Sequence, residues 1–242
     1  MKNKIQKEEF LTEGAFIGNI TEFIDNEKFN QVKDYIKELK NYIEINRKNC
    51  LECIFTLKDT GKNDYETYQD IRNVAYDDVE KTELFMKENG LESWQKWYML
   101  KKPWEFKQTY GEILDEISLK IVNYLYPENN FKKEDFEYSG TFTLYENTHF
   151  IENHRDGKNP NKICNILIYL NEEHDDENGG ELILKTYTNK ELTIKPLIGN
   201  FAVLDFTTGL GVEHSVNMVK GDYMRFAFLN GYSLRSSPVN LL

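Results

Sequence analysis

The chain of 242 residues lacks any long hydrophobic run. Its longest apolar stretch, Ile163 to Leu170, is interrupted by Asn165 and is far shorter than the roughly 20 residues that a membrane-spanning helix needs. No hydrophobic segment follows the basic residues at the N-terminus, so no secretory signal is predicted. We therefore expect a soluble, cytoplasmic protein with no membrane partner.

Cysteine is also scarce, with three residues in the chain. So few thiols indicate a reducing compartment rather than a disulfide framework. Cys50 and Cys53 form a lone CxxC pair, and a zinc site would want a second pair. We interpret both residues as structural thiols.

Basic residues are fewer than acidic residues, and proline is rare. The net charge of −11 argues against a nucleic-acid partner, which needs a basic surface. A small-molecule or peptide substrate is the expected partner, while the sequence does not predict the oligomeric state. The five prolines are scattered, and no Pro/Gly-rich linker divides the chain. We therefore predict one domain over residues 1–242.

Residues 1 to about 135 are predicted to form a mostly helical support region. Apolar residues recur with helical spacing at 26–44 and at 110–126, where Pro127 ends the helix. Residues 91–104 are predicted to be helical too.

From about residue 136 to 236 the pattern becomes β. Short apolar stretches alternate with turn residues and predict strands at 142–145, 162–170, 181–187, 191–194, 201–206 and 223–229. Because no long helix separates them, the strands predict an antiparallel sandwich or barrel. The strand at 163–170 is apolar on both faces, which indicates an inner strand covered by the N-terminal helices.

The chain has four histidines: His149, His154, His174 and His214. Non-haem iron(II) oxygenases need two imidazoles and one carboxylate on one face of the metal. A His-x-Asp pair on a strand supplies two such ligands, since residues two apart point to the same face.

Two His-x-Asp pairs are present, at 154–156 and 174–176. The second lies in an acidic stretch and is interpreted as a solvated turn, with a calcium loop as the alternative, although EF-hand spacing is absent. His149 lies five residues before His154 and would face the opposite side of a continuous strand. His154 and Asp156 therefore remain as the candidate ligands.

The context of this pair carries a family pattern. Its segments follow one another in this order: Tyr145 to Asp156; Ile168-Tyr169-Leu170-Asn171; Gly179-Gly180-Glu181-Leu182; Ile194 to Gly199; Val203 to Phe206; His214 to Val219; and Arg225-Phe226. In this combination the chain resembles the prolyl 4-hydroxylase-like family of Fe(II)/2-oxoglutarate-dependent oxygenases, over about residues 136–232.

The resemblance implies a double-stranded β-helix (jelly roll) flanked by N-terminal helices, in the α+β class with a mainly β core. It implies that His154, Asp156 and His214 bind Fe(II) and that the cofactors are Fe(II), 2-oxoglutarate and O2, with ascorbate as a stimulant. In related halogenases a small residue replaces the carboxylate, so Asp156 indicates hydroxylation. The expected reaction hydroxylates an unactivated C–H bond, of a prolyl or other amino-acid unit, peptidyl or free, and releases succinate and CO2.

The same resemblance assigns the 2-oxoglutarate pocket. Arg225 and Tyr145 are expected to bind the far carboxylate, and Asn165, Leu167 and Tyr169 to face the pocket, with core packing as an equal alternative for Leu167. Arg225 is also singled out by its place inside an apolar strand, where a buried charge needs a counter-charge. The segments 156–162 and 207–211 are expected to shape substrate access.

Two alternatives remain open. One is a cupin-type metal-dependent oxygenase that needs no 2-oxoglutarate, against which Arg225 and Tyr145 argue. The other is a non-catalytic jelly-roll binding module, against which an intact ligand triad argues.

Overall fold

The computed structural model describes residues 2–45, 50–55, 88, 95–100, 111–138, 140–156, 160–208 and 211–235. Its helices within these ranges are α1 (Lys2–Glu13), α2 (Asn26–Ile45) and α6 (Glu112–Leu125), with 3-10 turns η1 (Ile20–Glu22), η4 (Lys133–Asp135) and η5 (Asp176–Asn178). The two long helices predicted around 26–44 and 110–126 are thus present as α2 and α6.

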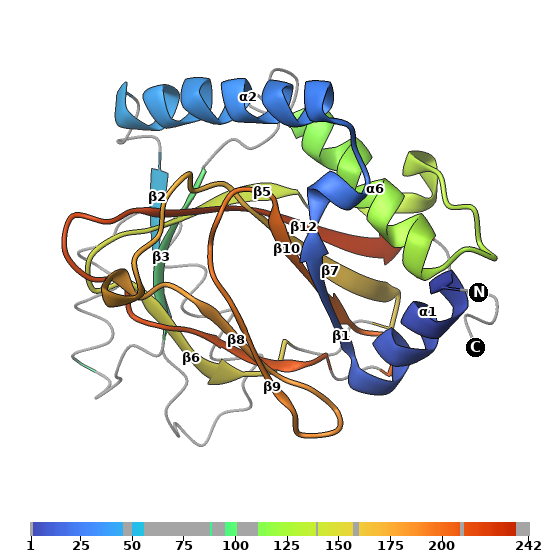
Figure 1. Ribbon diagram of the computed structural model, residues 1–242. Helices are drawn as coiled ribbons and strands as arrows, with labels where there is room; N and C mark the ends of the chain where they lie inside the picture. Colours follow the sequence, from blue (N-terminus) through green and yellow to red (C-terminus); the bar gives the residue numbers. More distant parts are fainter. Residues whose placement is uncertain are drawn as a thin grey trace.

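The strands form one antiparallel system that folds into two facing layers (Figure 1). They are β1 (Ala15–Asn19), β2 (Cys50–Phe55), β3 (Gln95–Leu100), β4 (Phe136–Tyr138), β5 (Thr141–Tyr145), β6 (Phe150–His154), β7 (Lys162–Tyr169), β8 (Leu182–Lys185), β9 (Glu191–Ile194), β10 (Asn200–Asp205), β11 (Glu213–Val216) and β12 (Arg225–Leu234). Their order is β1-β10-β7-β12-β5-β3-β6-β11-β8-β9, with β2 beside β3 and β4 beside β12.

The helices cover the outer face of the larger layer (Figure 1). Helix α2 contributes Val32, Ile36 and Leu39 to the core there, at the i, i+4, i+7 spacing that makes one helical face. Helix α6 adds Ile117 and Ile121, both fully buried. Burying each such side chain contributes about 1.5–3 kcal/mol, so packing against the sheet, rather than helix propensity, holds these helices in place.

Strands β7 and β12 separate two hydrophobic clusters. Ile166 and Phe228 point to the helices and belong to the outer cluster. Tyr169 and Ala227 point between the two layers and belong to the inner cluster. Because side chains alternate along a strand, each strand serves both cores. The predicted jelly roll with helical support is confirmed, and β7 is an inner strand between β10 and β12.

The prediction of a helix over residues 91–104 was wrong for its central part. Residues 95–100 form β3, which pairs with β2, β5 and β6 and so joins the two layers. The ranges 91–94 and 101–104 lie outside the described residues. β1 is a further strand in the region predicted to be mostly helical. In both places pairing with distant strands overrides the local preference of the segment.

Cys164 is a free, buried thiol on β7, as expected of a structural cysteine. Cys50 and Cys53 lie on β2, and their side chains are outside the described part of the chain. Within that part, no helix is both long enough and apolar enough to cross a membrane.

Candidate metal centre and co-substrate pocket

Two of the four histidines face each other across neighbouring strands. His154 is the last residue of β6, and His214 lies on β11. The two strands pair antiparallel with these residues in register, and a register shift follows before Val216. The pairing brings the two imidazole rings to a centroid distance of 4.2 Å.

Backbone carbonyls fix the tautomer of both rings. Nδ1 of His154 lies 2.8 Å from the carbonyl oxygen of Glu152, and Nδ1 of His214 lies 2.9 Å from that of Val212. A carbonyl can only accept, so each Nδ1 must carry the hydrogen. In the neutral ring Nε2 then holds the lone pair and is free to bind a metal, while the contact at Nδ1 orients the ring.

Asp156 completes this cluster two residues after the end of β6. Its Oδ1 lies 3.6 Å from Nε2 of His154. Its Oδ2 accepts a hydrogen bond of 2.9 Å from Nδ2 of Asn165 and lies 3.9 Å from Nζ of Lys162. One potential ligand atom from each of His154, Asp156 and His214 lies within 4.8 Å of the other two.

The electrostatics of this cluster favour a cation. Burial raises the pKa of the Asp156 carboxyl, but the neighbouring His154, His214 and Lys162 side chains outweigh it and hold the pKa well below its usual range. Burial also lowers the pKa of His214, although Asp156 opposes this. An ionised carboxylate and a neutral imidazole are the protonation states that metal binding requires.

A second group of polar side chains surrounds Arg225 at the start of β12. Arg225 is fully buried, and its guanidinium carbon lies 4.5 Å from the ring centre of Tyr145 and 5.1 Å from that of Tyr169. Its Nη2 donates a hydrogen bond of 3.5 Å to the Tyr169 hydroxyl, while Nε is buried and has no hydrogen-bond partner in the described part of the chain. No carboxylate of the described residues forms an ion pair with this arginine.

One face of β7 connects the two groups. Asn165 contacts Asp156 at one end of this face, and Tyr169 contacts Arg225 at the other. Leu167 lies between them, half-buried against the inner cluster. Four residues of strand span about 13 Å between the Cα atoms. One end of the inner face of β7 therefore lies beside a cluster that suits a bound cation. The other end lies beside a buried arginine that suits a bound anion.

The sequence of the core matches a known family. Residues 140–232 match the family model of the 2OG-Fe(II) oxygenase superfamily. This range covers the jelly-roll core from β5 to most of β12. No curated protein sequence gives a significant match to the chain.

Known structures share the fold of this core and its helices. A prolyl-4-hydroxylase from Pseudomonas putida is 14% identical, with a TM-score of 0.56 over 97% of this chain and 100% of its own. An oxidoreductase of the 2OG-Fe(II) oxygenase family from Burkholderia pseudomallei is 12% identical, with a TM-score of 0.56 over 99% and 93% of the two chains. A prolyl hydroxylase from Trichoplax adhaerens, in complex with a hypoxia inducible factor peptide fragment, is 14% identical, with a TM-score of 0.51 over 96% and 89%. At these identities the likeness concerns the fold.

The other two histidines lie outside the metal cluster. Nδ1 of His149 accepts a hydrogen bond of 3.3 Å from the backbone N–H of Glu146. The interpretation of residues 174–176 as a solvated turn was wrong for His174, whose side chain is fully buried. The reason is a tertiary contact, since its ring packs edge-on against Tyr223 with ring centres 5.6 Å apart.

Sequence reasoning missed two features of the metal cluster. Lys162 lies near Asp156 and places Nζ 4.1 Å from the ring centre of Phe206. Asn165 was expected to face the co-substrate pocket, and the structure shows its amide on Asp156. Its polar character inside an apolar strand was the available signal, but the identity of its partner depends on how β6 approaches β7.

The segments 156–162 and 207–211, which were expected to shape substrate access, both contain residues outside the described ranges.

Proposed function

We propose that this protein is an Fe(II)- and 2-oxoglutarate-dependent dioxygenase that hydroxylates an unactivated C–H bond. One observation carries the proposal: the inner face of β7 contacts a His/Asp/His cluster at one end and, at the other, a buried arginine that has no carboxylate partner among the described residues. A metal site alone fits many enzymes. The added buried cation calls for an anionic co-substrate, which argues against a cupin-type oxygenase and against a non-catalytic module.

In this proposal His154, Asp156 and His214 hold Fe(II). Two imidazoles and one carboxylate fit Fe(II) and leave its other positions for co-substrate and oxygen. The carbonyls of Glu152 and Val212 keep both rings in the Nε2 lone-pair tautomer. Asn165 holds the carboxylate by its second oxygen, so the ligand geometry exists before the metal arrives.

Arg225 and its two tyrosines would receive the far carboxylate of 2-oxoglutarate. The planar guanidinium matches a carboxylate through two parallel hydrogen bonds, and its unpartnered Nε is one donor that the described side chains leave unsatisfied. Tyr145 and Tyr169 stack on the guanidinium and keep it in place. Leu167 provides an apolar wall between the two polar ends of the co-substrate.

When bound, iron, 2-oxoglutarate and O2 supply the oxidising chemistry, which yields succinate, CO2 and a hydroxylated product. The protein's own task is positioning and exclusion of water. The inner cluster around the pocket, including Leu204, Val212 and Val216, is buried and apolar. Such a lining keeps bulk water from the reacting C–H bond.

The proposed substrate is a prolyl or other amino-acid unit, free or within a peptide. The Pseudomonas relative in fold is named a prolyl-4-hydroxylase, and the Trichoplax relative was determined with a peptide fragment. Both support this substrate class. The retained carboxylate at Asp156 supports hydroxylation over halogenation.

The test is succinate release from 2-oxoglutarate under Fe(II), ascorbate and oxygen, screened against proline-rich peptides and free amino acids. We expect succinate to form in step with a product heavier by one oxygen atom. Oxygen uptake without loss of 2-oxoglutarate would support a cupin-type enzyme instead. A chlorinated product, or ferrous iron that fails to bind, would contradict the proposal.

A further inference from the structure

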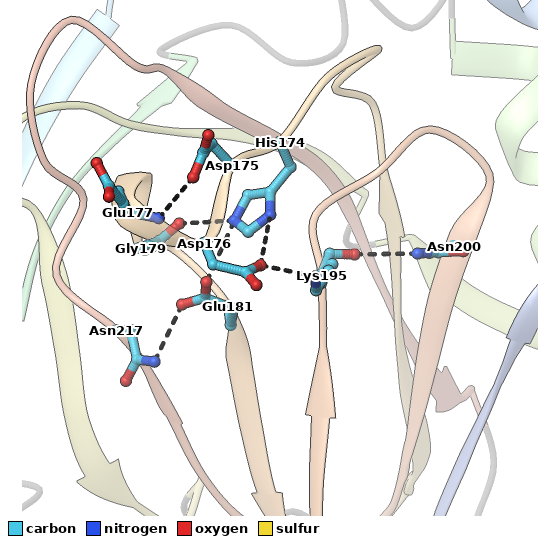
Figure 2. Close-up of polar contacts among 9 residues, drawn as sticks. All are labelled: His174, Asp175, Asp176, Glu177, Gly179, Glu181, Lys195, Asn200 and Asn217. Atoms are coloured by element: carbon cyan, nitrogen blue, oxygen red, sulfur yellow. Dashed lines mark hydrogen bonds and ion pairs between the residues drawn. The ribbon is translucent and has the colours of Figure 1, made fainter.

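A second histidine–carboxylate cluster lies outside the metal centre (Figure 2). His174 follows β7, Asp176 opens the 3-10 turn η5, and Glu181 directly precedes β8. One potential ligand atom from each of the three lies within 4.8 Å of the others. The imidazole is fully buried, Glu181 is nearly so, and Asp176 is open to solvent.

The hydrogen bonds of His174 determine where its lone pair points. Nε2 lies 3.0 Å from the carbonyl oxygen of Gly179 and 3.3 Å from Oε1 of Glu181. Both oxygens accept, so Nε2 carries the hydrogen and the neutral ring keeps its lone pair on Nδ1. A carboxylate and a carbonyl that hold the far N–H in this way are the outer contacts of many metal-bound histidines.

Nδ1 of His174 is buried and has no hydrogen-bond partner among the residues that the structure describes. The atom that it faces is Oδ1 of Asp176, at 4.0 Å. Two hydrogen-bond acceptors that face each other repel unless a proton or a cation lies between them. Zinc binds nitrogen and carboxylate oxygen at about 2.0–2.2 Å, so a separation of 4.0 Å leaves room for such an ion between them.

A lysine currently supplies the opposing charge. Nζ of Lys195 lies 2.6 Å from the same Oδ1 of Asp176, and this hydrogen bond lowers the pKa of the Asp176 carboxyl. Half of the Lys195 side chain and three quarters of the Asp176 side chain are exposed (49% and 75%). Exposed pairs of this kind contribute little to stability, so a divalent ion competes with the lysine at low cost.

We propose that His174, Asp176 and Glu181 form a second metal site, for a divalent transition metal of the zinc class. An imidazole nitrogen and a carboxylate oxygen are both ligands that such ions prefer. His174 Nδ1 and the Asp176 carboxylate are direct ligands, and Glu181 orients the ring and adds the second negative charge.

The site would join two segments that flank the oxygenase centre. Oε2 of Glu181 accepts a hydrogen bond of 3.0 Å from Nδ2 of Asn217, and the backbone N–H of Gly180 donates to the carbonyl of Asn217. Asn217 directly follows the strand that carries His214. A bound ion would thereby brace the loop after β7 against the end of β11.

The test counts zinc ions per chain by isothermal titration calorimetry of the full-length protein. We expect two equivalents in the wild type and one in Asp176→Asn, a variant at an exposed position that leaves the buried imidazole in place. The matched control is Glu177→Gln, which removes the same charge from the same turn and should keep both equivalents. All three proteins share every cysteine, so zinc held by thiols contributes equally.

Two further variants separate this site from the oxygenase centre. Lys195→Gln removes the competing cation and should tighten the second equivalent by about two- to fivefold, while His214→Ala should remove the other equivalent. A single equivalent that only Asp176→Asn removes would support this site and count against the His154 cluster. Two equivalents retained in Asp176→Asn, or a single one that His214→Ala removes, would overturn the proposal.

Discussion

The chain contains the His-x-Asp pattern twice, at 154–156 (the first copy) and at 174–176 (the second copy). The folded chain places the two copies in different surroundings. At 154–156 the pair sits beside a second imidazole from a neighbouring strand. At 174–176 the pair sits beside a carboxylate and a lysine. The first copy gathers two lone-pair nitrogens and one negative charge, whereas the second gathers one nitrogen, two negative charges and a competing positive charge.

This difference shows what a His-x-Asp pattern alone leaves open. In both copies the backbone fixes the ring through a carbonyl, but on opposite nitrogens: Nδ1 of His154 and Nε2 of His174. The exposed fraction of the carboxylate also differs, at 30% for Asp156 and 75% for Asp176. A partly enclosed site with two neutral imidazoles and one carboxylate suits redox iron, and a more open site with two carboxylates suits a structural ion.

The largest expected effect comes from removing a ligand of the first copy. Asp156→Ala or His214→Ala should lower turnover by more than about a hundredfold, because losing a direct ligand costs more than losing an outer contact. Iron binding and succinate release measure this. His149→Ala and His174→Gln serve as controls and should keep most activity. Inactivity of His174→Gln through loss of iron, with His154→Ala still active, would show that the roles of the two copies are reversed.

The next largest effect is expected at Arg225, the buried cation that accompanies the first copy. Arg225→Ala should raise the apparent KM for 2-oxoglutarate about ten- to hundredfold, since one charge-assisted pair contributes about 1.5–3 kcal/mol. Iron affinity should stay near the wild-type value. The control is Lys220→Ala, at an exposed position beside the turn that precedes β12. An unchanged KM in Arg225→Ala, with the increase found in Lys220→Ala instead, contradicts the assignment.

A smaller effect is expected at Asn165, the outer contact of the first copy. Asn165→Ala removes the donor to Oδ2 of Asp156 and should weaken iron binding about tenfold, the lower end of the range for such contacts. Equilibrium titration with ferrous iron under anaerobic conditions measures this. If iron affinity is unchanged and only the KM for 2-oxoglutarate rises, Asn165 serves the co-substrate and not the metal ligand.

The smallest effect is expected at the second copy. Asp176→Asn should change turnover by less than about twofold under saturating iron and 2-oxoglutarate, because an exposed pair adds little to stability. Steady-state succinate release measures this, with Glu177→Gln as the control. A loss of activity in Asp176→Asn alone would make the second cluster part of the catalytic apparatus.

Local patterns predicted part of this fold correctly. The strand predicted at 191–194 matches β9, and Arg225 lies inside an apolar strand as predicted, with Phe226 and Phe228 in the outer cluster. β6 and β11 were not among the predicted strand ranges, although they carry the two histidines. Their sequences, Phe150–His154 and Glu213–Val216, are short and polar, so the alternation of apolar residues that indicates a strand is weak.

The sequence by itself determined which residue types occur and which face of each inner strand they occupy. It does so because the two-residue repeat of a strand is a local property of the backbone. Asn165, Leu167 and Tyr169 therefore share a face whatever surrounds them.

Only the tertiary structure decided which residues meet. His214 reaches His154 because β11 pairs with β6, and β3 joins the two layers because its edges find partners in both. Likewise, Glu181 approaches His174 because the turn between them folds back on the chain. Such contacts depend on the register of strands that are distant in sequence. That register is selected by burying one face of every strand at once, a condition that no single segment contains.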